Sequence, residues 1–152
     1  MELIDYLRYD LVLKMTEAIG EETKRYSDKP LMVLENWANA YGLGILGSQS
    51  AFKSRLAIRQ KIPVLIDPFR QVYFFPTVSP DSHECVWINA SQIKSIRQAG
   101  LGCVIRFLDD RELVLAIGRR SLIKQWERCK MMEHLILRHR LNENPIPMNL
   151  MR

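Results

Sequence analysis

The stretch KIPVLIDPFRQVYFFPTVSP, residues 61–80, restricts the fold more than any other part of the chain. Two short apolar runs, VLI and VYFF, lie on either side of Asp67 and Pro68. Aspartate at the first position and proline at the second are typical of a tight turn, because proline presets its own φ angle. Aliphatic and aromatic runs of this kind favour strands. The stretch therefore predicts a β-hairpin whose turn fixes the pairing register, with Pro76 ending its second strand.

Other segments predict further strands. Leu11, Leu13 and Met15 alternate with their neighbours, which favours a strand, and the polar residues 19–28 predict a turn or loop. The remaining strand candidates are CVWI at 85–88, NASQIKSI at 89–96, GCVIRFL at 102–108 and LVLAI at 113–117. The sequence DDRE between the last two predicts the acidic turn of a second hairpin. We expect about six strands, mostly antiparallel because the connections are short.

A helix is predicted at residues 29–41. Asp28 can cap its start, Pro30 suits the first turn, and Gly42 suits the position after its end. The apolar residues that recur there at helical spacing are Leu31, Leu34, Trp37, Ala38 and Tyr41. This spacing predicts that one face of the helix packs against the rest of the fold.

A second helix is predicted at residues 121–140, with Ser121 as its cap. Its apolar stripe consists of Leu122, Trp126, Cys129, Met132 and Ile136. On the opposite side, Arg120, Lys124 and Arg128 repeat every fourth residue. The two prolines of residues 143–152 cannot extend the helix, so we expect one α+β domain at 1–142 followed by a short tail.

Residues 42–61 allow two interpretations. Ser48 or Ser50 could cap a short helix with Phe52 on its apolar side, whereas residues 55–59, RLAIR, could equally form a strand. The segment carries Lys53, Arg55, Arg59 and Lys61, and residues 36–66 contain no Asp or Glu. It is either a solvated loop that keeps the protein in solution or a flexible, Gly/Ser-rich loop that lies on the phosphates of a partner.

The charge of the chain is unevenly distributed. Residues 1–45 hold five Lys or Arg and eight Asp or Glu, a balance of −3, whereas residues 46–152 hold 17 and nine, a balance of +8. A basic surplus concentrated in one part of a chain indicates a polyanionic partner. The candidate contacts are Lys53, Arg55, Arg59, Lys61, Arg119, Arg120, Lys124 and Arg128.

The sequence nominates no catalytic or metal site. Cys129, His134 and His139 do not share one helix face, and the pair His83 and Cys85 has no assignable orienting acid. Phosphate-binding loops and dinucleotide or hydrolase motifs do not occur. We therefore expect neither an enzyme nor a cofactor or metal.

The three cysteines are widely spaced and odd in number, which is typical of reduced, buried thiols in a cytoplasmic protein. No apolar run approaches the roughly 18 residues that span a bilayer. The expected location is therefore the cytoplasm, without a membrane partner.

A series of motifs in fixed order resembles the ComK family of competence transcription factors. The motifs are KPLMVLENWANAYG at 29–42, GS at 47–48, KIPVLIDPFRQVYFFPT at 61–77 and ECVWINASQI at 84–93. Family members carry a Lys-Pro-Leu helix start, a Gly-Ser turn, an Asp-Pro hairpin ending in Phe-Pro-Thr, and then Cys-x-Trp-Ile. The similarity covers residues 29–93 and continues weakly to the last helix.

The resemblance implies a transcription activator that binds double-stranded, A/T-rich DNA, largely through the minor groove. It also implies a homodimer or higher homo-oligomer, and degradation through a proteolytic adaptor. The hairpin would then be structural, with a sheet core of Val64, Ile66, Val72, Phe74 and Trp87. The alternative is a regulatory or protein-interaction module that keeps the fold and does not bind DNA.

Overall fold

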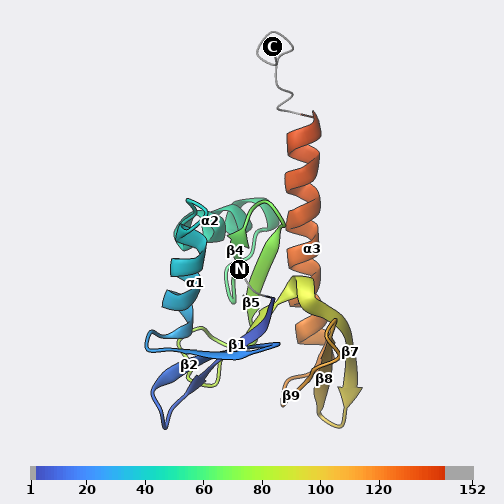
Figure 1. Cartoon of the computed structure of the whole chain (residues 1–152). Helices are drawn as coiled ribbons and strands as arrows, with labels where there is room; N and C mark the ends of the chain where they lie inside the picture. The colour runs from blue at the N-terminus through green and yellow to red at the C-terminus, as the bar shows by residue number, and fades with distance from the viewer. Residues whose placement is uncertain (1–2, 143–152) are drawn as a thin grey trace.

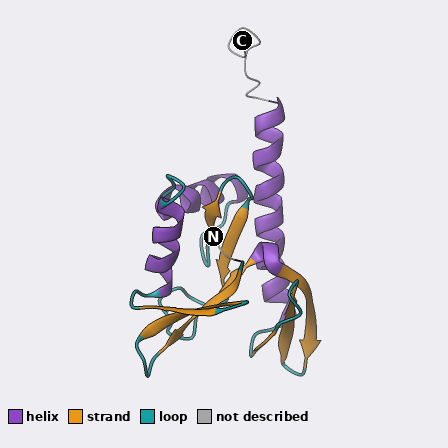
Figure 2. Cartoon of the chain, viewed as in Figure 1, coloured by secondary structure: helices purple, strands orange, loops and turns teal. Residues whose placement is uncertain are grey.

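Residues 3–142 fold into two antiparallel sheets and three α-helices, with the longest of these helices standing beside both sheets (Figure 1). A computed structural model describes residues 3–142, and the side chains of residues 3–138. The α+β class predicted from the sequence is confirmed (Figure 2). The predicted tail at 143–152 lies outside the described residues.

The larger sheet has six strands in the order β3-β2-β1-β6-β5-β4. Their bounds are β1 (Ile4–Asp10), β2 (Met15–Gly20), β3 (Thr23–Tyr26), β4 (Val64–Asp67), β5 (Val72–Pro76) and β6 (Trp87–Asn89). The smaller sheet follows the chain as β7 (Ile93–Ala99), β8 (Gly102–Phe107) and β9 (Glu112–Leu115). The helices are α1 (Pro30–Asn39), α2 (Ile45–Leu56) and α3 (Arg119–Asn142), and a 3₁₀ turn, Ala90–Gln92, links β6 to β7.

The larger sheet is buried on both faces around the predicted hairpin. All five predicted core residues are buried and pack in one cluster with Leu34 and neighbouring residues of α1. On the opposite face, Tyr73 and Phe75 pack against α2, α3 and the smaller sheet. Because neighbouring residues of β5 point to opposite faces and both faces are covered, the run VYFF is apolar throughout.

The predicted turn holds the hairpin as expected. The Oδ1 atom of Asp67 accepts hydrogen bonds from the backbone N–H groups of Phe69, at 2.9 Å, and Arg70, at 3.1 Å. Gln71 follows with a left-handed backbone, φ 56°. The turn sets the observed register, in which Val64 faces Phe74.

Helix α3 attaches the smaller sheet to the larger one. Leu122, Cys129 and Met132 of its predicted stripe are buried, and the Trp126 indole donates to the carbonyl oxygen of Ala90 at 3.1 Å. Cys85, Cys103 and Cys129 are free and buried, as the sequence predicts.

Several local predictions are wrong. Residues 11–14 form a turn instead of a strand, because the Asp10 carboxylate accepts from the N–H groups of Val12 and Leu13 and closes the turn between β1 and β2. The polar residues 23–26, predicted as loop, pair with β2 as strand β3. Strand β1, at residues 4–10, was not predicted either, and the described range holds nine strands instead of about six.

The helix caps also differ from prediction. Lys29, rather than Asp28, precedes α1, and no side chain caps that helix. Ser121 lies inside α3, which begins two residues earlier at Arg119. Residues 45–56 form α2, so the strand interpretation of 55–59 is wrong. Gly44, and neither Ser48 nor Ser50, occupies its N-cap position.

Candidate nucleic-acid interface

The α2–β4 loop, residues 57–63, carries the predicted contacts Arg59 and Lys61. Ala57, at the end of α2, and Lys61 both have left-handed backbones, with φ angles of 53° and 49°. Residues other than glycine seldom adopt this conformation, so surrounding contacts must hold it. Ile58 and Ile62 are buried, which anchors the loop in the core and leaves Arg59 exposed between them.

Gln125 of α3 holds this loop in place. Its side chain is only 2% exposed, and its Nε2 atom donates to the carbonyl oxygens of Lys61, at 2.7 Å, and Pro76, at 3.0 Å. Its Oε1 atom accepts from Arg128 Nη1 at 2.7 Å. A buried amide satisfied in this way fixes the groups around it. Gln125 therefore joins α3 to the loop and to the end of β5.

The basic row of α3, Arg120, Lys124 and Arg128, reaches the same loop at Arg128. Residues four apart share one side of a helix. Arg128 Nη1 lies 3.5 Å from the carbonyl oxygen of Gln60, and Lys61 Nζ donates to Ser121 Oγ at 3.4 Å. Two segments about 60 residues apart in sequence thus meet and form one surface, with Arg59 and Lys61 on the loop and Arg128 on α3. Lys124 and Arg120 lie about one and two helical turns before Arg128.

The other three predicted contacts lie elsewhere. Lys53 and Arg55 are exposed on α2, which is a regular helix anchored by buried Phe52. The prediction that these two residues lie on a flexible loop is therefore wrong. Arg119 Nε donates to the carbonyl oxygen of Ile96 in β7 at 2.8 Å. That bond ties Arg119 to the smaller sheet.

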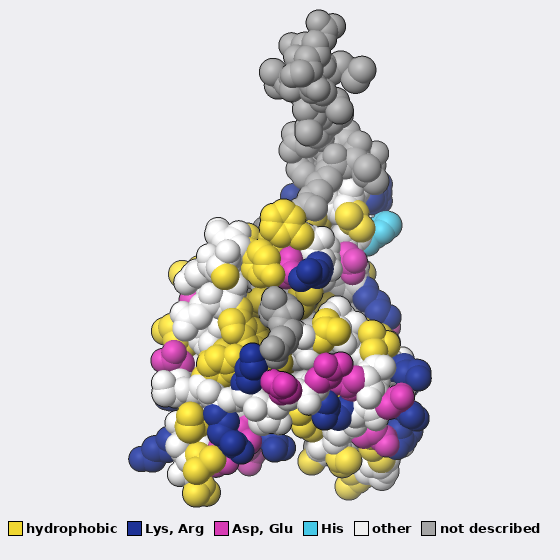
Figure 3. Space-filling view, in the orientation of Figure 1, with side chains coloured by type: hydrophobic (Ala, Val, Ile, Leu, Met, Phe, Trp, Pro, Cys, Tyr) yellow, Lys and Arg dark blue, Asp and Glu magenta, His cyan; other side chains and the backbone are white. Residues whose placement is uncertain are grey.

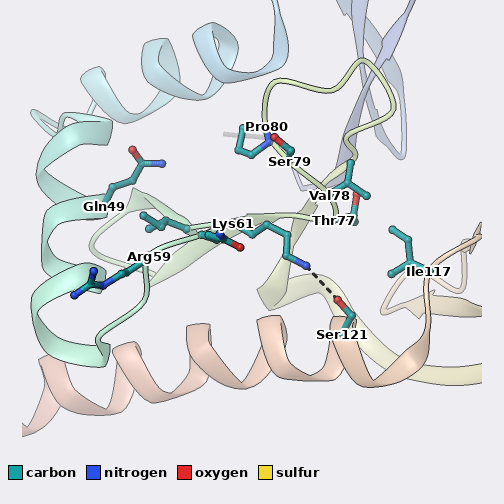
Figure 4. Close-up of a pocket in the computed structure, with 11 residues that line it drawn as sticks. Gln49, Arg59, Lys61, Thr77, Val78, Ser79, Pro80, Ile117 and Ser121 are labelled. Atoms are coloured by element: carbon teal, nitrogen blue, oxygen red, sulfur yellow. Dashed lines mark hydrogen bonds between the residues drawn. The ribbon is translucent and has the colours of Figure 1, made fainter.

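A cleft of about 750 Å³ opens where the α2–β4 loop, the segment after β5 and the start of α3 meet (Figure 4). Lys61 reaches toward Ser121, whereas Arg59 points away from it toward α2 (Figure 4). The neutral polar side chains that line the cleft are Gln49, Gln60, Thr77, Ser79 and Ser121. No Asp or Glu side chain of the described residues lines it.

The sequence did not reveal these neutral residues, because they come from segments far apart in the chain. For Gln125, by contrast, the sequence does contain a signal. Gln125 is a polar residue one helical turn after Leu122 and one before Cys129, on the buried side of α3. A polar side chain at such a position indicates a buried hydrogen bond.

The smaller sheet also carries many cations, yet they are paired with acids. Arg97 lies 2.7 Å from Glu112, Arg106 lies 3.3 Å from Asp110, and Lys94 lies 3.6 Å from the same Asp110 carboxylate. Basic and acidic side chains accordingly alternate across that part of the surface (Figure 3). Their fields largely cancel at a distance, so this sheet is a poorer site for a polyanion than the cleft.

The cysteines and acids do not form a reactive centre in the described part of the chain. Burial raises the pKa of the thiols of Cys85, Cys103 and Cys129, which keeps them protonated near neutral pH. Among residues 3–142, no three His, Cys, Asp or Glu side chains are grouped to hold a metal ion. Nor does that part of the chain contain a helix both long and apolar enough to cross a membrane.

Comparison with protein families gives a match over most of the chain. The family model described as ComK protein matches residues 8–141. The chain belongs to the ComK family. The resemblance found in the motifs of residues 29–93 is thereby confirmed, and it extends over β1 to α3.

One curated relative matches as well. The competence transcription factor of Bacillus subtilis (strain 168) is 24% identical over 113 residues. The match covers 70% of this chain and 59% of that relative, so the chain spans about three fifths of the relative's length. No solved structure matches the chain.

Proposed function

We propose that this ComK-family chain is a DNA-binding regulator of transcription. The observation that carries the proposal is that α3 contacts the α2–β4 loop through Ser121 and Arg128, beside a cleft lined by Arg59 and Lys61 and by no Asp or Glu of the described residues. Cations gathered on one surface, with no salt bridge to an acid of the described residues, attract the phosphates of nucleic acid. The relative named a competence transcription factor supports the same function.

The two parts of the surface suit different tasks. The basic row repeats along a helix and suits contacts that position the protein along phosphates. Arg59 projects from a loop between two buried isoleucines, and a single exposed arginine of this kind can enter a narrow, A/T-rich minor groove, whose negative potential is enhanced. We therefore assign preference for A/T-rich DNA to Arg59 and general affinity to the row.

Binding of an A/T-rich and a G/C-rich duplex, measured by fluorescence anisotropy across a range of salt concentrations, tests this assignment. Arg120→Ala with Lys124→Ala should weaken both duplexes and flatten the slope of log affinity against log salt by about two. Arg128 is left intact, because it also bonds Gln125. Arg59→Ala should reduce the preference for the A/T-rich duplex.

The matched control is Lys94→Ala with Arg97→Ala, which removes two cations that are paired with Asp110 and Glu112. It should change the slope much less than the α3 pair does. Equal effects of the two pairs would show that another surface binds DNA. If the wild-type chain binds neither duplex at low salt, DNA binding is contradicted and the alternative, a protein-interaction module, is favoured.

The same proposal includes association of copies of the chain. Helix α3 rises beyond both sheets (Figure 1), and its Met131 and Leu137 side chains are 53% and 44% exposed. Apolar side chains on a projecting helix are typical of an interface. Light scattering at tens of micromolar should give at least the mass of a dimer, and a monomer at that concentration would contradict this part of the proposal.

A further inference from the structure

The cleft beside Lys61 has the composition of an anion site. Its lining combines cationic, hydroxyl and amide side chains with apolar ones, and it includes no acidic side chain from the part of the chain that the structure describes. At about 750 Å³ it lies within the range of small-molecule sites, roughly 300 to 1,000 Å³, and it is larger than a phosphate group requires. Its size and its donors therefore fit a phosphate ester, including part of the group that carries the phosphate.

Lys61 is the central cation of the cleft. Its left-handed backbone, φ 49°, is held by the bond from buried Gln125 to its carbonyl oxygen. The side chain is half-buried, and no Asp or Glu among the described residues lies within 4.0 Å of its ammonium group. An ammonium group has three N–H donors, and the bond to Ser121 Oγ at 3.4 Å engages one of them.

Ser121 adds a second donor aimed at the same place. Its Oγ atom accepts from Lys61, and no hydrogen bond found among the described residues uses its own O–H proton, which can donate to a ligand. Ser121 lies in the first turn of the 24-residue α3, a turn without acidic residues, where the helix dipole favours negative charge. Ser79 and Gln60 supply neutral donors from other walls of the cleft.

We propose that this cleft binds a phosphate ester, held by Lys61 and Ser121. The ester has two possible sources, a backbone phosphate of DNA and a free phosphorylated small molecule. The first source rests on the proposed function, whereas the phosphate site itself does not. In either case the strained backbone of Lys61 serves to direct its ammonium group into the cleft.

The test titrates the full chain with inorganic phosphate at constant ionic strength, with chloride as the replaced anion, and follows backbone amide chemical shifts. Saturable shifts at Lys61 and Ser121 are expected. Lys61→Gln should raise the Kd for phosphate about tenfold or more, and Ser121→Ala should raise it severalfold.

Lys14→Gln is the matched control, because Lys14 is an exposed lysine with nearly the same left-handed backbone, φ 52°, in the turn between β1 and β2. It should leave the Kd for phosphate unchanged. Thermal unfolding of both glutamine variants separates loss of a ligand contact from loss of the fold. Phosphate that does not bind saturably, or that binds Lys61→Gln as tightly as wild type, overturns the proposal.

Competition identifies the source. If phosphate at constant ionic strength weakens duplex binding by the wild type and not by Lys61→Gln, the occupant is a backbone phosphate. If duplex and phosphate bind together, the site serves a free phosphorylated molecule. If the chain binds phosphate through Lys61 and no duplex at all, the proposed function fails and the phosphate site remains.

Discussion

Asp67 and Asp5 are both closed off from solvent, with exposed fractions of 1% and 0%, yet their carboxyl groups are held in opposite ways. Burial alone would raise the pKa of Asp67, but N–H groups of Arg70 and Phe69, the Tyr41 hydroxyl and the Arg70 guanidinium together lower that pKa. Burial raises the pKa of Asp5 from 3.8 to about 7, the Asp109 carboxylate adds to the rise, and Arg111 opposes it.

The difference shows that a buried carboxylate is more readily hydrogen-bonded when its donors are close to it in the sequence. The donors of Asp67 come from the two residues after Pro68 and are brought into place by the turn itself. Asp5 lies on β1, and its neighbours Asp109 and Arg111 lie in the turn between β8 and β9 of the other sheet. Arg111 Nε is 3.4 Å from Asp5 Oδ2, but neither oxygen of Asp5 accepts a hydrogen bond from the described residues.

The largest effect is expected from Asp5. Its folded-state pKa is above its unfolded value, so the unfolded chain releases this proton first as pH rises. The free energy of unfolding should therefore fall between about pH 4 and pH 7, by roughly 2 to 4 kcal/mol, and level off above pH 7. Asp5→Asn, which stays neutral, should abolish the fall and be the more stable protein at pH 8. Urea unfolding across this pH range measures both.

Asp110→Asn is the control for this experiment. Asp110 lies in the same turn as Asp109 and Arg111 but is exposed, and asparagine tolerates its left-handed backbone, φ 68°. The pH profile of this variant should match that of the wild type. If the free energy of unfolding of Asp5→Asn still falls between about pH 4 and pH 7 as in the wild type, another group causes the pH dependence. Asp5 could then no longer be contrasted with Asp67.

A smaller effect, with the opposite dependence on pH, is expected from Asp67. Asp67→Ala leaves two backbone N–H groups of the turn without their acceptor and should lower the free energy of unfolding by about 2 to 3 kcal/mol at pH 7. The folded-state pKa of Asp67 is lowered, so its contribution is present above pH 3.8 and is lost as pH falls below that value. The difference between variant and wild type should therefore shrink under acid conditions.

Asp10→Ala sharpens this result, because Asp10 makes the same bonds at a half-buried site. Its Oδ1 atom accepts from Val12 at 2.9 Å and Leu13 at 3.1 Å, the same distances as in the Asp67 turn. Water can replace the lost acceptor there, so the loss should be about 1 kcal/mol. Equal losses at the two turns would mean that burial adds nothing to the cost of removing the carboxylate.

By itself, the sequence determined the features whose causes lie within a few residues. The Asp-Pro turn, the two apolar runs beside it, the helical spacing of α1 and the apolar stripe of α3 were all predicted, because each depends on local backbone preference and side-chain periodicity. The basic surplus after residue 45 was equally evident.

Only the tertiary structure decided how distant segments meet. Residues 45–56 became a helix because buried Ile45 and Phe52 anchor them in the two cores, although the local sequence of residues 55–59 also allowed a strand. Lys61 meets Ser121, and Asp5 meets Arg111, across sequence separations of 60 and more than 100 residues. No local preference encodes such pairs. They follow from packing α3 and the smaller sheet against the larger one. Among the described residues, this packing places Lys61 in a cleft that no acid lines and leaves the Asp5 carboxyl group without a hydrogen-bond donor.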